Sequence, residues 1–210
     1  NPEIFRDAIV QVFAARAFSW RGILGVHTWI AVKPTNASAY TVYQLVGWRL
    51  RRGENPVVIE HDIPDRLWYD AMPELLVDIR GAGVDAVIEE IDIAAKSYPY
   101  KNTYSVWPGP NSNTFIAWIG RLVPELRLDL PATAIGKDWL GGGRIFARAP
   151  SGTGYQLSLF GLFGILLGLE EGLEINIFGL NFGIDALDTN LRLPGIGRIG
   201  PSNKVKPRTL

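Results

Sequence analysis

The sequence predicts an α+β fold, with a mostly antiparallel sheet, two helices packed on it and a β-rich C-terminal extension. Apolar runs of strand length, separated by turn residues, occupy positions 9–79. Two later segments carry apolar residues at helical spacing, and residues 155–187 are rich in Leu, Ile, Phe and Gly. At 210 residues the chain suits one domain with an appendage, which we divide as 1–150, 151–197 and a basic tail, 198–210.

The strands of the predicted sheet come first along the chain. Segment 40–50 is rich in Tyr, Val and Trp and has apolar residues on both faces, which indicates a central strand. Segment 63–73 has prolines at both ends and mixed charge, so we expect a loop there. The other predicted strands are 9–16, 26–33, 57–60 and 75–79.

Two helices are predicted after these strands. The first covers 84–95, where apolar residues recur at helical spacing and acidic residues fill the other side. The second begins after the Trp-Pro-Gly-Pro turn at 107–110 and ends at Pro124. Asn111 or Ser112 is its natural N-cap, because a short polar side chain there can accept the first backbone N–H groups.

The C-terminal third is predicted to be β-structure with a hairpin turn at 170–172. Its most apolar run, 157–169, is shorter than the ~20 residues that a membrane-spanning helix needs. We interpret this run as a pair of buried strands rather than an interfacial segment. The basic tail carries Lys204, Lys206 and Arg208, and we expect a solvated, partly disordered end. The alternative is an electrostatic contact with anionic lipid or a partner.

Composition excludes several classes of function. A net charge of zero argues against nucleic-acid binding, and the lack of cysteine removes thiolate metal sites and cysteine nucleophiles. With 2 histidines, a multi-histidine metal site within one chain is excluded, so we expect neither metal nor cofactor. The G-x-G-x-x-G at 195–200 is followed at once by Pro201, which leaves no room for a dinucleotide-binding βαβ unit.

One set of residues resembles the parts of a hydrolase site. Ser112 opens a helix, where backbone N–H groups near Asn113 and the helix dipole could stabilise an oxyanion. His27 lies on a predicted strand, and Gln44 on the next strand could orient it. The pattern predicts Ser112 as nucleophile, His27 as general base and Gln44 as orienting group. The simpler interpretation is structural, with Ser112 as a helix cap and His27 as a core residue.

Two resemblances sharpen this prediction. His-Thr-Trp-Ile at 27–30 and Asn-Ser-Asn-Thr-Phe at 111–115 resemble the circularly permuted papain-like superfamily, which includes NlpC-type cell-wall peptidases and the lecithin retinol acyltransferase family. That resemblance covers about residues 20–125 and implies a cysteine where this chain has Ser112. The chain also resembles a bacterial membrane-associated family of unknown function, on segments 14–18, 20–22, 26–30, 98–100, 107–115, 130–131 and 134–138.

The second resemblance implies a location in the bacterial cell envelope, because such proteins often carry a hydrophobic N-terminal segment. We expect a membrane or a membrane-protein complex as partner, on the periplasmic side. The favoured function is a non-catalytic binding or structural subunit, because a serine hydroxyl does not ionise as a papain-type thiol does. The alternative is a serine-dependent amide or ester hydrolase or acyltransferase acting on cell-wall peptide or lipid. Predicted binding residues are Asn111, Asn113, Trp29 and Trp107.

Overall fold

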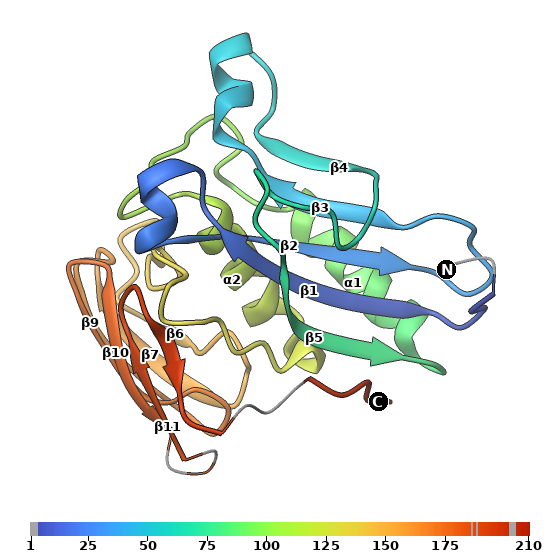
Figure 1. Cartoon of the computed structure of the whole chain (residues 1–210). Coiled ribbons are helices and arrows are strands. Elements are labelled where there is room, and N and C mark those ends of the chain that lie inside the picture. Colours follow the sequence, from blue (N-terminus) through green and yellow to red (C-terminus); the bar gives the residue numbers. More distant parts are fainter. Residues whose placement is uncertain (1–3, 186, 188, 202–204) are drawn as a thin grey trace.

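The computed structural model describes residues 4–185, 187, 189–201 and 205–210, so Lys204 of the basic tail lies outside the described residues. Two antiparallel sheets and two α-helices make up most of this part of the chain (Figure 1). The predicted α+β class is therefore confirmed. Within the described residues, no helix is both long and apolar enough to cross a membrane.

The first sheet is five-stranded, in the order β4-β3-β2-β1-β5. Its residues are mostly β-branched or aromatic, which suits a pleated surface buried on both sides. The helices α1 (Val84–Lys96) and α2 (Ser112–Leu122) cover one face, as Figure 1 shows, and pack on Ile30 and Val32. The strands are β1 (Ile9–Arg16), β2 (Val26–Lys33), β3 (Thr41–Leu45), β4 (Val57–His61) and β5 (Glu74–Arg80).

The other face of this sheet is covered by the loop predicted at 63–73. Trp68 from that loop packs with Phe13, Trp29 and Val42 in a second buried cluster. The Trp29 indole N–H donates to Pro64 O at 2.7 Å, which satisfies the buried donor and ties the loop to β2. Most of the five-stranded sheet is therefore covered on both faces.

The predicted strand 40–50 is wrong in its second half. β3 ends at Leu45, and the chain turns into a 3-10 helix, η2 (Gly47–Arg52). A glycine is required at position 47, because a Cβ there would lie 2.6 Å from the Tyr104 ring. As predicted, β3 is an interior strand, but its ladder with β2 covers only the pairs from Ile30↔Tyr43 to Val32↔Thr41. Towards His27 the two strands are no longer paired.

The second sheet is a seven-stranded meander in which each strand pairs with its sequence neighbours. It begins at Phe146, and its turn at 169–171 falls at the predicted hairpin position. Figure 1 shows it beside the five-stranded sheet. The strands are β6 (Phe146–Arg148), β7 (Gly154–Leu159), β8 (Phe163–Gly168), β9 (Gly172–Ile177), β10 (Leu180–Asp185), β11 (Asn190–Leu193) and β12 (Gly197–Ile199).

The polarity of this second sheet is reversed, so the prediction of a buried strand pair at 157–169 is only half right. Strands form there, but alternate side chains point to solvent because the apolar set faces outward. We call this surface the outer face. Its side chains have exposed fractions between 40% and 65%: Tyr155, Leu157, Leu159, Phe163, Ile165, Leu167, Leu173, Ile175, Ile177, Phe182, Ile184 and Leu191.

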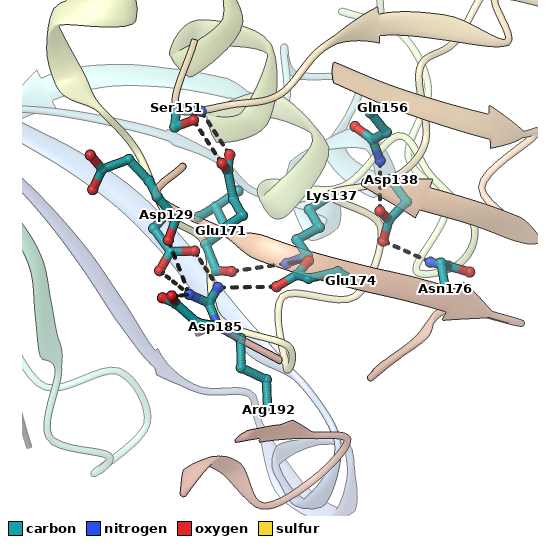
Figure 2. A network of polar contacts seen from close by, with 12 residues as sticks. Asp129, Lys137, Asp138, Ser151, Gln156, Glu171, Glu174, Asn176, Asp185 and Arg192 are labelled. Carbon is teal, nitrogen blue, oxygen red and sulfur yellow. Dashed lines mark hydrogen bonds and ion pairs between the residues drawn. The ribbon is translucent and has the colours of Figure 1, made fainter. Parts of the chain in front are cut away.

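The inner face of the second sheet carries buried charges instead (Figure 2). The Arg192 guanidinium donates to Asp129 at 2.5 and 2.8 Å, to Glu174 at 3.1 Å and to Asp185 at 3.3 Å. Glu174 and Arg192 meet over Gly183, where a Cβ would lie 3.0 Å from the Glu174 side chain. Burial alone would lower the pKa of Arg192, but these carboxylates raise it above its usual value.

Two further buried contacts join the segment before β6 to this inner face. The Lys137 ammonium donates to Glu174 at 2.5 Å and to Leu130 O at 2.9 Å. The Asp138 carboxylate accepts from Gln156 and Asn176, both at 2.6 Å (Figure 2). The second sheet is thus attached to the rest of the chain by ion pairs and hydrogen bonds rather than by an apolar core.

Residues 205–210 are mostly exposed, in line with the predicted solvated end, but Arg208 is paired with the first sheet. Arg208 forms a parallel bridge with Ile79 of β5. The N–H of Arg80 donates to Arg208 O at 2.9 Å, and the N–H of Arg208 donates to Asp78 O at 3.0 Å. Backbone pairing explains the difference, because β5 is an edge strand with unpaired groups that the segment satisfies.

Candidate functional site

A cavity of about 920 Å³ lies where β2 and β3 separate. Its lining combines the start of β2, the turn after β3 and the N-terminus of α2. Ser112 and His27 both line this cavity, although one stands on a helix and the other on the sheet. Thr28 faces α2, with its hydroxyl 3.0 Å from Asn113 Oδ1, whereas His27 faces the opposite side of the sheet with Trp68. Ser112 and His27 therefore approach the cavity from opposite faces of the sheet.

Asn111 is the N-cap of α2, so Ser112 is not. The Asn111 carboxamide oxygen accepts from the N–H groups of Asn113 at 2.9 Å and Thr114 at 3.1 Å. Thr114 completes a capping box by accepting from the Asn111 N–H at 2.7 Å. Within the described residues, the Ser112 hydroxyl and its backbone N–H make no hydrogen bond. Ser112 thus keeps a free hydroxyl at the positive end of a helix.

Asn113 fixes the start of α2 against β2. Its side chain accepts from the Thr28 hydroxyl at 3.0 Å and donates to Val26 O at 3.1 Å and Ile135 O at 2.8 Å. The Asn111 amide also donates to Ile135 O, at 3.1 Å. Both asparagines line the cavity, but their side chains are engaged in holding the scaffold. The Asn113 N–H is used by the cap, which leaves the Ser112 N–H as the free donor at this helix end.

His27 is held by two side chains from other parts of the chain. Its Nε2–H donates to Gln44 Oε1 at 3.1 Å, and its ring stacks on Trp68 with centroids 3.7 Å apart and 4° between the planes. Because Gln44 Oε1 accepts this hydrogen bond, the proton of the neutral ring is on Nε2 and Nδ1 carries the lone pair. Burial lowers the pKa of His27 to about 4, against an opposing effect of the Gln44 hydrogen bond. The imidazole is therefore neutral at pH 7.

The remaining walls of the cavity are aromatic and basic. Arg21, Arg51 and Arg52 line it, and the Arg21 guanidinium lies 4.9 Å from the centroid of the Trp20 ring. The aromatic lining residues are Phe18, Trp20, Trp48, Trp68, Tyr69 and Tyr104. Such a surface suits an apolar ligand that carries a negatively charged group.

Trp29 and Trp107, which were predicted as binding residues, do not line this cavity. Trp29 is buried on the sheet, and Trp107 packs on the turn after β9, where a Cβ on Gly179 would lie 2.4 Å from its indole nitrogen. The lining residues Trp48 and Trp68 were not predicted. Their signal was available in part, because Trp48 stands beside Gly47 and the Arg51-Arg52 pair at the end of an apolar strand. Among the residues that the structure describes, no group of acidic and histidine side chains is arranged to hold a metal.

Comparison with known proteins identifies the family. The family model described as "Protein of unknown function (DUF3750)" matches residues 7–139, which is more than half of the chain. The chain belongs to this family. The DUF3750 match includes His27, Gln44 and Ser112 and ends before β6, so the seven-stranded sheet lies beyond it. No curated protein and no solved structure matches the chain.

Proposed function

We propose that the chain is a serine-dependent acyl hydrolase or acyltransferase, with its active site in the cavity at the end of β2 and β3. The observation that carries this proposal is the division of roles at the start of α2. Asn111 performs the capping, and the Ser112 hydroxyl is left free beside the cavity that His27 also lines. The structural role predicted for Ser112 as a helix cap is thereby taken by its neighbour.

The proposed reaction uses the unprotonated Nδ1 of His27 and requires the ring to reach Ser112 through the gap between β2 and β3. Nδ1 accepts the proton of the Ser112 hydroxyl while the serine oxygen attacks the carbonyl carbon of an ester or amide. The carbonyl oxygen becomes an oxyanion, stabilised by the Ser112 N–H and the helix dipole. The carbon–leaving-group bond then breaks, and protonated His27 returns its proton to the leaving group. Water or an acceptor alcohol attacks the acyl-serine in the second half-reaction.

The neutral state of His27 supports a serine nucleophile more than a cysteine one. Papain-type chemistry uses a thiolate–imidazolium pair, which requires a charged histidine. A serine mechanism requires a neutral imidazole in the resting state, and burial keeps His27 neutral at pH 7. The permuted papain-like arrangement is thus proposed here in a serine form.

The lining of the cavity favours an apolar acyl group as the substrate part that is recognised. Aromatic and aliphatic side chains form most of the walls, and Arg21, Arg51 and Arg52 could pair with a phosphate or carboxylate. A lipid-like ester with an anionic group fits this chemistry better than an unsubstituted cell-wall peptide. Both substrate classes remain within the proposed reaction.

The proposal is tested with an alkyl fluorophosphonate, which phosphonylates activated serines. Intact-protein mass spectrometry should detect one adduct on the wild type and none on Ser112→Ala. Ser105→Ala is the matched control and should label as the wild type does, because the Ser105 hydroxyl donates to Trp107 O and does not line the cavity. His27→Ala should slow labelling by about 10²-fold or more. A wild type that stays unlabelled would contradict the proposal.

A second candidate is the non-catalytic binding or structural subunit at a bacterial membrane. The observation in its favour is that, among the described residues, no hydrogen bond joins Ser112 Oγ to His27. This candidate predicts ligand binding without chemistry. A fluorescent fatty acid would bind the wild type and Ser112→Ala with equal affinity and bind Trp48→Ala more weakly, while the fluorophosphonate would leave all three unmodified.

A further inference from the structure

The outer face of the seven-stranded sheet is too large and too apolar for ordinary protein surface. Directly paired residues make it continuous, since Ile165 lies opposite both Leu157 on β7 and Ile175 on β9. About half of each large side chain is exposed, which leaves on the order of 1,000 Å² of apolar area. The largest apolar patch of a typical monomer covers about 300–600 Å².

We propose that this outer face is a homodimer interface that binds the outer face of a second copy of the chain. A stable interface needs about 800 Å² from each partner, and the outer face exceeds that area. A sheet with one apolar face is stabilised by a second layer, and residues of the described chain provide none on this side. Two copies related by a two-fold axis present surfaces of equal twist, which pack face to face as in a β-sandwich.

The chemistry of the sheet favours a protein partner over a lipid surface. Segments that lie on membranes carry Trp, Phe or Leu on the apolar side and are rich in Lys or Arg, which contact anionic headgroups. No Trp and no Lys occurs between Phe146 and Ile199. Arg148 is opposite Tyr155 on the edge strand β6, so a basic residue stands at the margin of the face and not around it. Branched aliphatic side chains at alternate positions are those of a sandwich core.

This proposal is independent of the catalytic one, because none of the outer-face side chains lines the cavity. A fluorophosphonate-inactive protein can therefore still dimerise, and a monomer can still be labelled. The two proposals fail in different experiments.

Size-exclusion chromatography with light scattering gives the first test. The wild type should have about twice the chain mass of 23.2 kDa at micromolar concentration. Ile165→Glu, at the centre of the face, should raise the dimer dissociation constant by at least ~100-fold, because symmetry buries the charge twice. Ile93→Glu is the matched control, since Ile93 is 67% exposed on α1, and it should remain dimeric. A monomeric wild type would overturn the proposal.

Cysteine labelling tests the same face without adding charge. The chain has no cysteine, so Ile175→Cys and Ile93→Cys each introduce a single thiol. A maleimide should modify Ile93→Cys rapidly and Ile175→Cys at least ~10-fold more slowly, with the difference disappearing on dilution below the dissociation constant. Equal rates of modification at all concentrations would contradict a second copy as the occupant. So would a monomer that sediments with phosphatidylcholine vesicles and whose Ile175→Cys thiol is then protected from the maleimide.

Discussion

The two sheets of this protein differ in which side chains they bury. The five-stranded sheet turns apolar side chains to both of its faces and buries them under helices and a loop. The seven-stranded sheet turns charged and amide side chains inward and apolar side chains outward. Burial beneath the first sheet is therefore hydrophobic, whereas burial beneath the second depends on satisfied charges.

The difference follows from what each sheet packs against. Helices α1 and α2 offer apolar stripes, and a sheet facing them gains from being apolar. The second sheet faces segment 127–144, which presents Asp129, Lys137 and Asp138. Buried ions of this kind require a partner for every charge, so the inner face of the second sheet is polar at matching positions.

The largest expected effect comes from breaking the ionic layer. Arg192→Met leaves the carboxylates of Asp129, Glu174 and Asp185 without their shared cation, and should lower the free energy of unfolding by about 3–5 kcal/mol. Arg198→Met removes an exposed pair with Asp129 and should cost less than about 1 kcal/mol. Urea unfolding measures both. Equal losses would mean that the second sheet does not depend on the buried network.

The same leucine truncation on each sheet sharpens the comparison. Leu45→Ala removes a fully buried side chain from the first sheet and should cost about 2–5 kcal/mol. Leu167→Ala, on the outer face, should cost less than about 1 kcal/mol in the Ile165→Glu background, where the face stays unpaired. Thermal unfolding of the four proteins, including each parent, gives the result. A large loss for Leu167→Ala in that background would show that the outer face is covered within a single chain.

Low pH is expected to destabilise the first sheet through the buried, neutral side chain of His27. The pKa of His27 is about 4 in the folded chain and 6.5 in the unfolded chain. As the pH falls below 6.5, His27 is therefore protonated in the unfolded chain before it is protonated in the folded one. The contribution of His27 to stability is complete above pH 6.5 and falls by about 3 kcal/mol as the pH drops to 4. His27→Gln should lose less stability than the wild type over this range. Parallel curves of unfolding free energy against pH for the two proteins would contradict a lowered pKa of His27 in the folded chain.

Local rules of sequence accounted for much of the first sheet and its site. Helical spacing placed α1 and α2, and short polar residues after a Pro-Gly-Pro turn narrowed the cap to Asn111 or Ser112, of which Asn111 is the cap. We expected His27 and Gln44 on neighbouring strands, and the structure places His27 Nε2 3.1 Å from Gln44 Oε1. Local rules did not reveal where β2 and β3 separate, because at that point Gly47 lies against the ring of Tyr104, which comes from a distant segment of the chain. Trp48, which follows β3, and Trp68, in the loop after β4, line the cavity opened there.

The polarity of the second sheet lies outside what an alternating pattern can specify. Residues 155–184 alternate between apolar and polar or glycine, and this period is the same whichever set faces inward. Burial of Glu174 and Arg192 becomes understandable only once Asp129 and Lys137, far away in sequence, are seen to face them. Which face of the sheet is turned inward is thus decided by tertiary contacts.

The pairing of Arg208 with Ile79 has a consequence for synthesis of the chain. The ribosome releases β5 long before it adds Arg208, so the first sheet forms with its outer hydrogen-bonding edge open. An open edge is a template for pairing with another nascent chain, and that hazard persists until translation reaches residues 205–210. The segment around Arg208 therefore covers this edge late in synthesis, and slow translation through the seven-stranded sheet would lengthen the interval during which the edge stays open.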